Sequence, residues 1–136
     1  MVALKRAQIR RDAPGVDVTV MSSKGRARSL APTWELVMGH KNGTISNDEY
    51  AYAYGALLNL VSTDDWNWLQ EQKDTNHEVY LLCYCRDGKF CHTHLIGLYA
   101  QALLPEVFEC RTSPPESVLE TAWHLELAGS NKNQVQ

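Results

Sequence analysis

Three of the four cysteines and two of the five histidines in this 136-residue chain fall within residues 83–94. They are Cys83, Cys85, Cys91, His92 and His94. A thiolate is both a nucleophile and a metal ligand, and an imidazole accepts protons or binds metal near neutral pH. This stretch is therefore the strongest candidate for a chemical site.

Three chemistries fit these residues. In the first, a reactive thiolate lies in a small-molecule pocket and His92 carries a proton or orients the thiol, giving a Cys/His-dependent hydrolase or transferase with no cofactor. In the second, Cys83, Cys85, Cys91 and one of His92 or His94 bind zinc, although the one-residue gap between the first two cysteines is shorter than usual zinc-ligand spacing. In the third, Cys83 and Cys85 pack in the core of a buried strand and the histidines are capping or packing groups. A disulfide between Cys83 and Cys85 is not expected, because residues two apart in an extended chain lie near the distance limit for a relaxed bridge.

Hydrophobic patterning places the stretch between a strand and a helix. Residues 78–85 form a nearly continuous apolar run, which is typical of a central parallel strand covered on both faces. Apolar residues then recur at helical spacing over residues 95–103, which predicts a helix that begins near His92. At such a position the helix dipole lowers a thiol pKa and favours a bound anion.

The other segments alternate between strands and helices. Residues 16–20 and 106–110 are the further predicted strands, and Ser46 with Glu49, like Ser113 with Glu116, has capping-box spacing. Helices are predicted from residues 33, 46, 63, 92 and 113, the last running to about residue 127. This order predicts a small three-layer Rossmann-like α/β fold with a mainly parallel sheet, as one domain over residues 1–128 with a flexible polar tail over 129–136.

Ligands of such sheets usually bind beyond the carboxyl ends of the strands, which directs attention to residues 21–28 and 83–92. Ser22, Lys24 and Arg26 follow the first predicted strand and offer a hydroxyl and two cations to a phosphate or carboxylate. A solvated basic surface is the alternative for this run. The tryptophans are assigned mainly to the core: Trp34, Trp66, Trp68 and Trp123.

Charge and hydropathy narrow the class of protein. The formal net charge of −3 argues against a general polyanion-binding surface, although a local basic patch for nucleic acid is left open. The chain has no apolar run of 18 residues, and its start is charged, unlike a signal peptide. We therefore expect a cytoplasmic protein without a membrane partner, in a compartment that keeps thiols reduced.

The motif resembles a known family. Residues 81–85 followed by Cys91-His92 at a helix start are similar to the signature of the bacterial, archaeal and phage family called domain of unknown function 488. Further similar elements extend the resemblance over most of residues 16–104. Family members typically place Arg directly after the Cys-His pair, where this chain has Thr93. The resemblance implies a fold related to Rossmann-type sheets with the motif at a strand-to-helix junction, and it supplies no reaction.

The leading hypothesis is therefore a protein that binds or processes an anionic small molecule, such as a nucleotide. Cys83, Cys85, Cys91 and His92 are the catalytic candidates, with the three residues after the first predicted strand as anion contacts. The alternative is a non-catalytic, zinc-stabilised module that binds a protein or nucleic acid.

Overall fold

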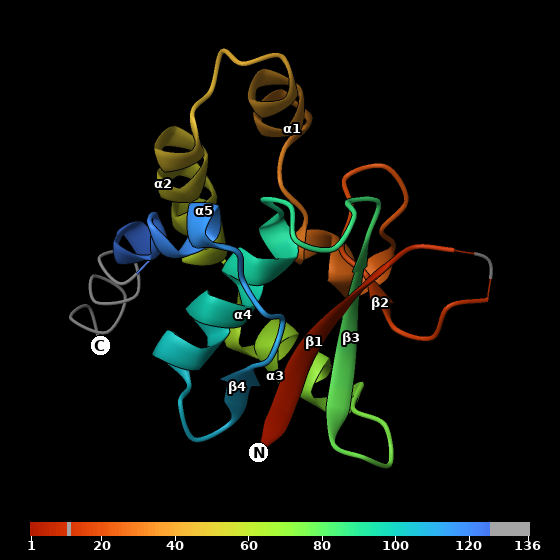
Figure 1. Ribbon diagram of the computed structural model, residues 1–136. Helices are drawn as coiled ribbons and strands as arrows, with labels where there is room; N and C mark the ends of the chain where they lie inside the picture. The colour runs from red at the N-terminus through yellow and green to blue at the C-terminus, as the bar shows by residue number, and fades with distance from the viewer. Residues whose placement is uncertain (11, 126–136) are drawn as a thin grey trace.

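The computed structural model describes residues 1–10 and 12–125 (Figure 1). No helix in these ranges is both long enough and apolar enough to cross a membrane. The predicted tail, residues 129–136, lies outside the described residues. The strands are β1 (Val2–Gln8), β2 (Val16–Asp17), β3 (Glu78–Cys83) and β4 (Phe108–Cys110). The helices are η1, a 3₁₀ helix (Gly25–Leu30), α1 (Trp34–Lys41), α2 (Asn47–Leu58), α3 (Thr63–Glu71), α4 (His92–Leu103) and α5 (Glu116–Leu119).

The four strands form one parallel sheet in the order β2-β3-β1-β4. This arrangement confirms the predicted Rossmann-like α/β class with a parallel sheet. The register between β1 and β3 runs from Ala3 opposite Glu78 to Gln8 opposite Cys83. Because the strands are parallel and in this register, the ends of β1 and β3 lie side by side at one edge, where Cys83 meets the following loop.

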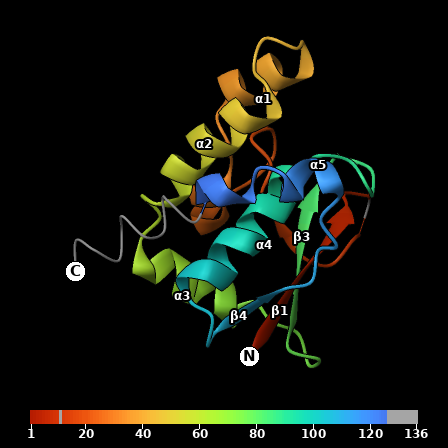
Figure 2. The ribbon, with the colours of Figure 1, turned by 60° about the vertical axis from the view of Figure 1, so that its left-hand side comes forward.

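One face of the sheet builds the core. Val2 and Leu4 of β1 and Val79 and Leu81 of β3 are buried at alternate positions, as expected for side chains that share a sheet face. Helix α4 packs on this face, α2 packs on α4 and α1 packs on α2 (Figure 2). The apolar residues of α4 recur at helical spacing, so the strand and the helix bury their apolar faces against each other.

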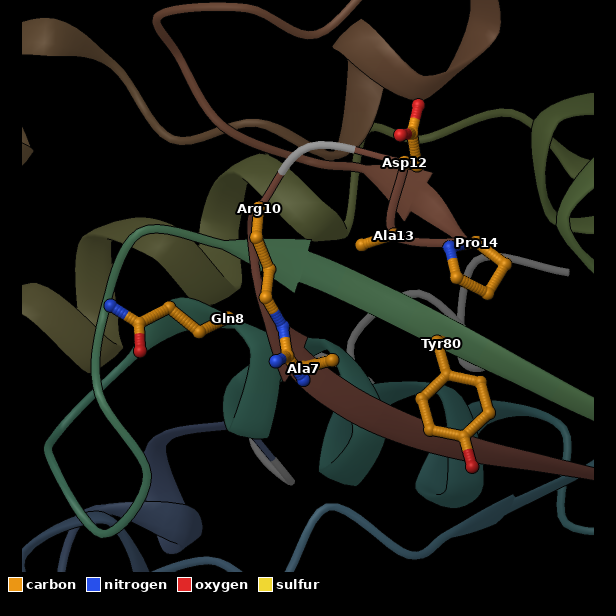
Figure 3. Close-up of a pocket in the computed structure, with 7 residues that line it drawn as sticks. All are labelled: Ala7, Gln8, Arg10, Asp12, Ala13, Pro14 and Tyr80. Carbon is orange, nitrogen blue, oxygen red and sulfur yellow. The ribbon is translucent and has the colours of Figure 1, made fainter.

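The opposite face of the sheet has a different covering. Within the described residues the helices lie on the α4 side (Figures 1 and 2), so the third layer predicted from the sequence does not form there. Arg10 and residues 12–15 partly cover the other side (Figure 3). Gly15 packs against β3 so closely that a Cβ would lie 2.5 Å from the Tyr80 carbonyl oxygen. Leu82 is buried on this side, whereas Glu78 and Tyr80 are half-buried. On this face of β3, Leu82 is therefore the one side chain that is fully covered. A hollow of about 400 Å³ opens beside Tyr80.

Several predicted elements are confirmed with shifted ends. The strand predicted over residues 16–20 ends at Asp17, because its carboxylate accepts hydrogen bonds from the Thr19 backbone N (2.9 Å) and hydroxyl (2.7 Å) and turns the chain. The Ser46 and Glu49 capping box is present at the start of α2. Strand β3 ends at Cys83 rather than at residue 85.

Two features differ from the sequence predictions. Strand β1 was not predicted, although it is an interior strand of the sheet. The Ser113 capping box is wrong, because Ser113 has a left-handed backbone (φ 57°) and Pro115 is the N-cap of α5 without a side-chain hydrogen bond. Helix α5 ends at Leu119, residues 120–121 form a turn and residues 122–125 are again helical, so the predicted last helix is interrupted; its residues 126–127 lie outside the described residues.

Candidate functional site

The thiols and an imidazole of residues 83–94 line a pocket of about 660 Å³, which we call the cysteine pocket. It lies at the carboxyl end of β3, between the first turn of α4 and the residues that follow β2. Cys83 is the last residue of β3 and Cys91 is the N-cap of α4. The loop between them returns the chain to its starting point, so residues eight apart come together.

The three sulfur atoms form a compact group. The Sγ atoms of Cys83, Cys85 and Cys91 all lie within 4.8 Å of one another, and those of Cys83 and Cys91 are 3.1 Å apart. Cys83 and Cys91 are buried, with 1% and 3% of their surface exposed, whereas Cys85 is half-buried. Cys83 is a buried strand residue, as the third interpretation expects, and the three thiols also meet in one pocket.

A buried arginine holds this group in place. Arg6 of β1 donates from Nη2 to the Cys83 sulfur (3.1 Å) and to the Cys85 carbonyl oxygen (2.6 Å), and from Nε to the Thr93 hydroxyl (3.3 Å). Its side chain is 4% exposed, and it also pairs with the exposed Asp87. The guanidinium thus connects β1, the loop after β3 and the first turn of α4.

Hydrogen bonds shift the pKa values of Cys91 and Cys85 in opposite directions. Hydrogen bonds from the thiols of Cys83 and Cys85, and from the Thr93 hydroxyl at 3.3 Å, lower the pKa of Cys91 well below its usual value despite burial. Hydrogen bonds to Cys83 and Cys91, together with burial, raise the pKa of Cys85. The thiolate of the group is therefore expected at Cys91, which suits that residue to nucleophilic attack.

The imidazole beside Cys91 has a defined tautomer. His92 Nε2 lies 2.8 Å from the Val18 carbonyl oxygen, which can only accept, so Nε2 carries the proton. Burial lowers the pKa of His92, so the ring is neutral near pH 7 and its Nδ1 is a proton acceptor. Nδ1 lies 3.8 Å from the Cys91 sulfur, and the ring packs edge-on against Tyr54. The backbone bond and this packing aim the basic nitrogen at the sulfur.

Aromatic and cationic side chains form the remaining walls. Tyr50 and Phe90 line the pocket in an edge-to-face pair with ring centroids 5.6 Å apart. Trp34 also lines it and is 48% exposed, so its assignment to the core was wrong. Two exposed lysines, Lys41 and Lys89, also line the pocket.

The anion contacts predicted after β2 lie elsewhere. Ser22 donates to Asp17 and contacts the Tyr84 hydroxyl at 3.1 Å, and together with Lys24 it lines a separate hollow. Arg26 pairs with Asp65 at 2.9 Å. None of Ser22, Lys24 and Arg26 lines the cysteine pocket, because the chain turns after Asp17 and, of residues 18–28, only residues 19–21 line it.

The second histidine of the motif, His94, does not line the cysteine pocket. His94 Nδ1 contacts the Thr112 hydroxyl at 2.8 Å, and burial and the nearby Arg6 lower the pKa of His94 to about 4. Within the described residues, Cys83, Cys85 and Cys91 are the group of three ligands that could hold a metal. The distances between these sulfur atoms match those of a tetrahedral zinc site only in part. A tetrahedral site with Zn–S bonds of about 2.3 Å separates sulfur atoms by about 3.8 Å, so Cys83 and Cys91 would have to move apart.

Sequence reasoning missed Arg6, Lys89 and the aromatic walls. The signal for Arg6 was the alternation of Val2, Leu4 and residue 6 in one strand, which puts the arginine on the buried face. No comparable signal places Lys89 in the pocket, because its position depends on the path of the loop after β3.

A parallel α/β protein with a thiol cluster at a strand-to-helix junction is the class that fold and site define. The chain belongs to the DUF488-N3 family: the family model described as the "Active DUF488-N3 subclade" matches residues 3–103, which include Arg6 and the whole cysteine pocket. This match confirms the resemblance seen in the motif. No curated protein and no solved structure matches the chain.

Proposed function

We propose that this protein is a thiol-dependent hydrolase or transferase that acts in the cytoplasm on an anionic small molecule such as a nucleotide. The observation that carries the proposal is the pairing of Cys91 with His92. A thiol and a proton acceptor lie 3.8 Å apart in a pocket, and the acceptor is oriented by a bond to Val18. A nucleophile beside an oriented base is the arrangement of covalent catalysis.

The reaction would proceed in two steps. The Cys91 thiolate attacks an electrophilic carbon, a bond from sulfur to carbon forms, and the leaving group departs with its electron pair and takes a proton from solvent. His92 Nδ1 then accepts the proton of a water or of an acceptor hydroxyl, which attacks the same carbon. The bond to sulfur breaks, the thiolate returns, and His92 releases its proton to solvent.

The pocket walls support the choice of substrate. Tyr50, Phe90 and the exposed Trp34 offer flat apolar surfaces that suit a planar ring, and base-aromatic stacking contributes about 1–3 kcal/mol per base. Lys41 and Lys89 line the same pocket and suit a phosphate or carboxylate. A nucleotide carries both groups in one molecule.

Ligand protection of Cys91 tests the proposal. Mononucleotides, nucleosides and inorganic phosphate are each added at increasing concentration while iodoacetamide labels the thiols, and the labelling rate of Cys91 is followed by peptide mass spectrometry. We expect nucleotides to slow the labelling and to raise the melting temperature, and replacement of both Lys41 and Lys89 by alanine to remove both effects. Lys73→Ala, at an exposed site after α3, is the control. Failure of every anionic ligand to protect Cys91 would reject the substrate class.

Arg26→Ala and Lys24→Ala test the anion contacts predicted from the sequence. If Lys24 binds the substrate from the hollow that it lines with Ser22, and Arg26 from its position beside Asp65, each variant weakens nucleotide protection. Protection as strong as in the wild type would remove both residues from the site.

A zinc site is the second candidate function, and the three sulfur atoms within 4.8 Å of one another favour it. Cys83, Cys85 and Cys91 would hold the ion, which would stabilise the loop after β3. Elemental analysis of untagged protein separates the candidates. One equivalent of zinc, lost together with folding on chelation, supports the binding module, whereas metal-free folded protein with a fast-reacting Cys91 supports the enzyme.

A further inference from the structure

The distance between two buried sulfur atoms distinguishes Cys83 and Cys91 from Cys85, the third thiol of the cysteine pocket. Their Sγ atoms are 3.1 Å apart, and a disulfide needs about 2.05 Å, so an approach of about 1 Å would join them. The two residues lie at the end of β3 and at the N-cap of α4. Cys85 follows two residues after Cys83, a spacing that disfavours a bridge within one extended segment.

We propose that the Cys83 and Cys91 pair is a reversible oxidation site that forms an intramolecular disulfide in response to a hydroperoxide. This inference goes beyond the proposed function, because it concerns the redox state of the site and requires no substrate. The access route is the cysteine pocket itself, which both residues line. A small peroxide enters such a pocket, whereas burial of both sulfur atoms shields them from bulky thiols.

The oxidation balances with the hydroperoxide as the oxidant. The Cys91 sulfur attacks the outer peroxide oxygen, the O–O bond breaks, and an alcohol or water leaves with Cys91 as a sulfenic acid. The Cys83 thiol then attacks the sulfenic sulfur. The S–S bond forms, the S–O bond breaks, and the departing hydroxide takes the thiol proton as water.

The surroundings favour the second step over further oxidation. Thr93 donates to the Cys91 sulfur at 3.3 Å, Arg6 donates to the Cys83 sulfur at 3.1 Å, and the two sulfur atoms are 3.1 Å apart, so the Cys83 thiol lies within reach of a sulfenic acid on Cys91. The resulting disulfide would remove both thiols from chemistry until a dithiol reductant restores them.

The positions of lysine and arginine allow a direct test by peptide mapping. The full-length protein is reduced, treated with a chelator, and exposed to hydrogen peroxide. Trypsin cleavage after Lys73, Arg86 and Lys89 places Cys83 and Cys85 on the peptide 74–86, and Cys91 with Cys110 on the peptide 90–111. We expect an intact mass lower by about 2 Da, a link between the two peptides, and recovery of the original mass with dithiothreitol.

Four single variants assign the linked residues. The linked peptides should form in Cys110→Ser and in Cys85→Ser, and should be lost in Cys83→Ser and in Cys91→Ser. The first two variants keep the test valid even if a change at the buried pair prevents folding. A bridge confined to the peptide 74–86, a link that persists in Cys83→Ser, or a gain of oxygen on Cys91 in place of the link would each overturn the proposal.

Discussion

Replacement of Arg6 by alanine should destabilise the protein strongly, because the guanidinium is buried and has partners on three elements. It donates to the Cys83 sulfur, the Cys85 carbonyl oxygen and the Thr93 hydroxyl. Hydrogen bonds that involve a charged group contribute about 1.5–3 kcal/mol each, and the pair with exposed Asp87 adds at most about 1 kcal/mol. Since these contributions are not additive, we expect Arg6→Ala to lower the free energy of unfolding by about 2–4 kcal/mol.

Urea denaturation followed by tryptophan fluorescence measures this loss. The midpoint should fall while the dependence on urea stays constant, since the core is unchanged. Lys5→Ala is the matched control. Lys5 lies next to Arg6 on the opposite sheet face and makes a partly exposed ion pair with Glu78 at 2.7 Å, so its loss should lower the stability much less than the loss of Arg6. Arg6→Lys should recover part of the stability, because it keeps the charge and loses the fork of donors.

Equal destabilisation by Arg6→Ala and Lys5→Ala would refute this reasoning. It would mean that the guanidinium contributes no more than a surface cation, and that the loop after β3 is positioned by its own backbone.

Three further predictions concern folding. His94 is 1% exposed and has a pKa of about 4, below its usual value of 6.5. Between these two pH values the unfolded state binds more protons than the folded state. The free energy of unfolding should therefore fall by roughly 1–3 kcal/mol as the pH drops from 6.5 to 4. Urea midpoints across this range should fall less in His94→Gln, and an equal fall would contradict the assignment. Gly15→Ala should destabilise by about 1–3 kcal/mol because its Cβ would meet Tyr80, whereas Gly43→Ala, also at positive φ but in open space, should cost only about 1 kcal/mol; melting temperatures that rank them in reverse would refute the close approach. Cys91→Ser should keep cooperative unfolding in the metal-free protein, with a loss below about 2 kcal/mol, and a non-cooperative transition by calorimetry would instead support structural zinc.

Local signals in the sequence predicted the frame of the site. The apolar run at residues 78–85 and the helical repeat after His92 placed a strand and a helix correctly, because both segments bury apolar residues with a regular period. The Ser46 capping box succeeded for the same reason, since its two hydrogen bonds lie within four residues. The clustering of Cys83, Cys85 and Cys91 followed from their place at this junction.

Tertiary contacts decided what the sequence left open. Arg6 interrupts the apolar alternation of β1, and its burial makes sense only once the sulfur atoms and Thr93 are beside it. Ser113 precedes two prolines that restrict the backbone, so its hydroxyl does not cap α5. Trp34 begins α1 on the pocket side, where its ring remains half exposed.

The most direct test of the central claim compares the reaction rates of individual thiols. Iodoacetamide labelling at neutral pH reports Cys91 against Cys110, which is more exposed and lies outside the sulfur group. Because both cysteines lie on the tryptic peptide 90–111, fragment ions from tandem mass spectrometry separate the two labels. We predict that Cys91 reacts faster despite its burial, and that His92→Gln alters its rate and pH dependence while His40→Gln, on the same pocket wall, does not. A Cys91 that reacts more slowly than Cys110 and is insensitive to His92 would contradict the account.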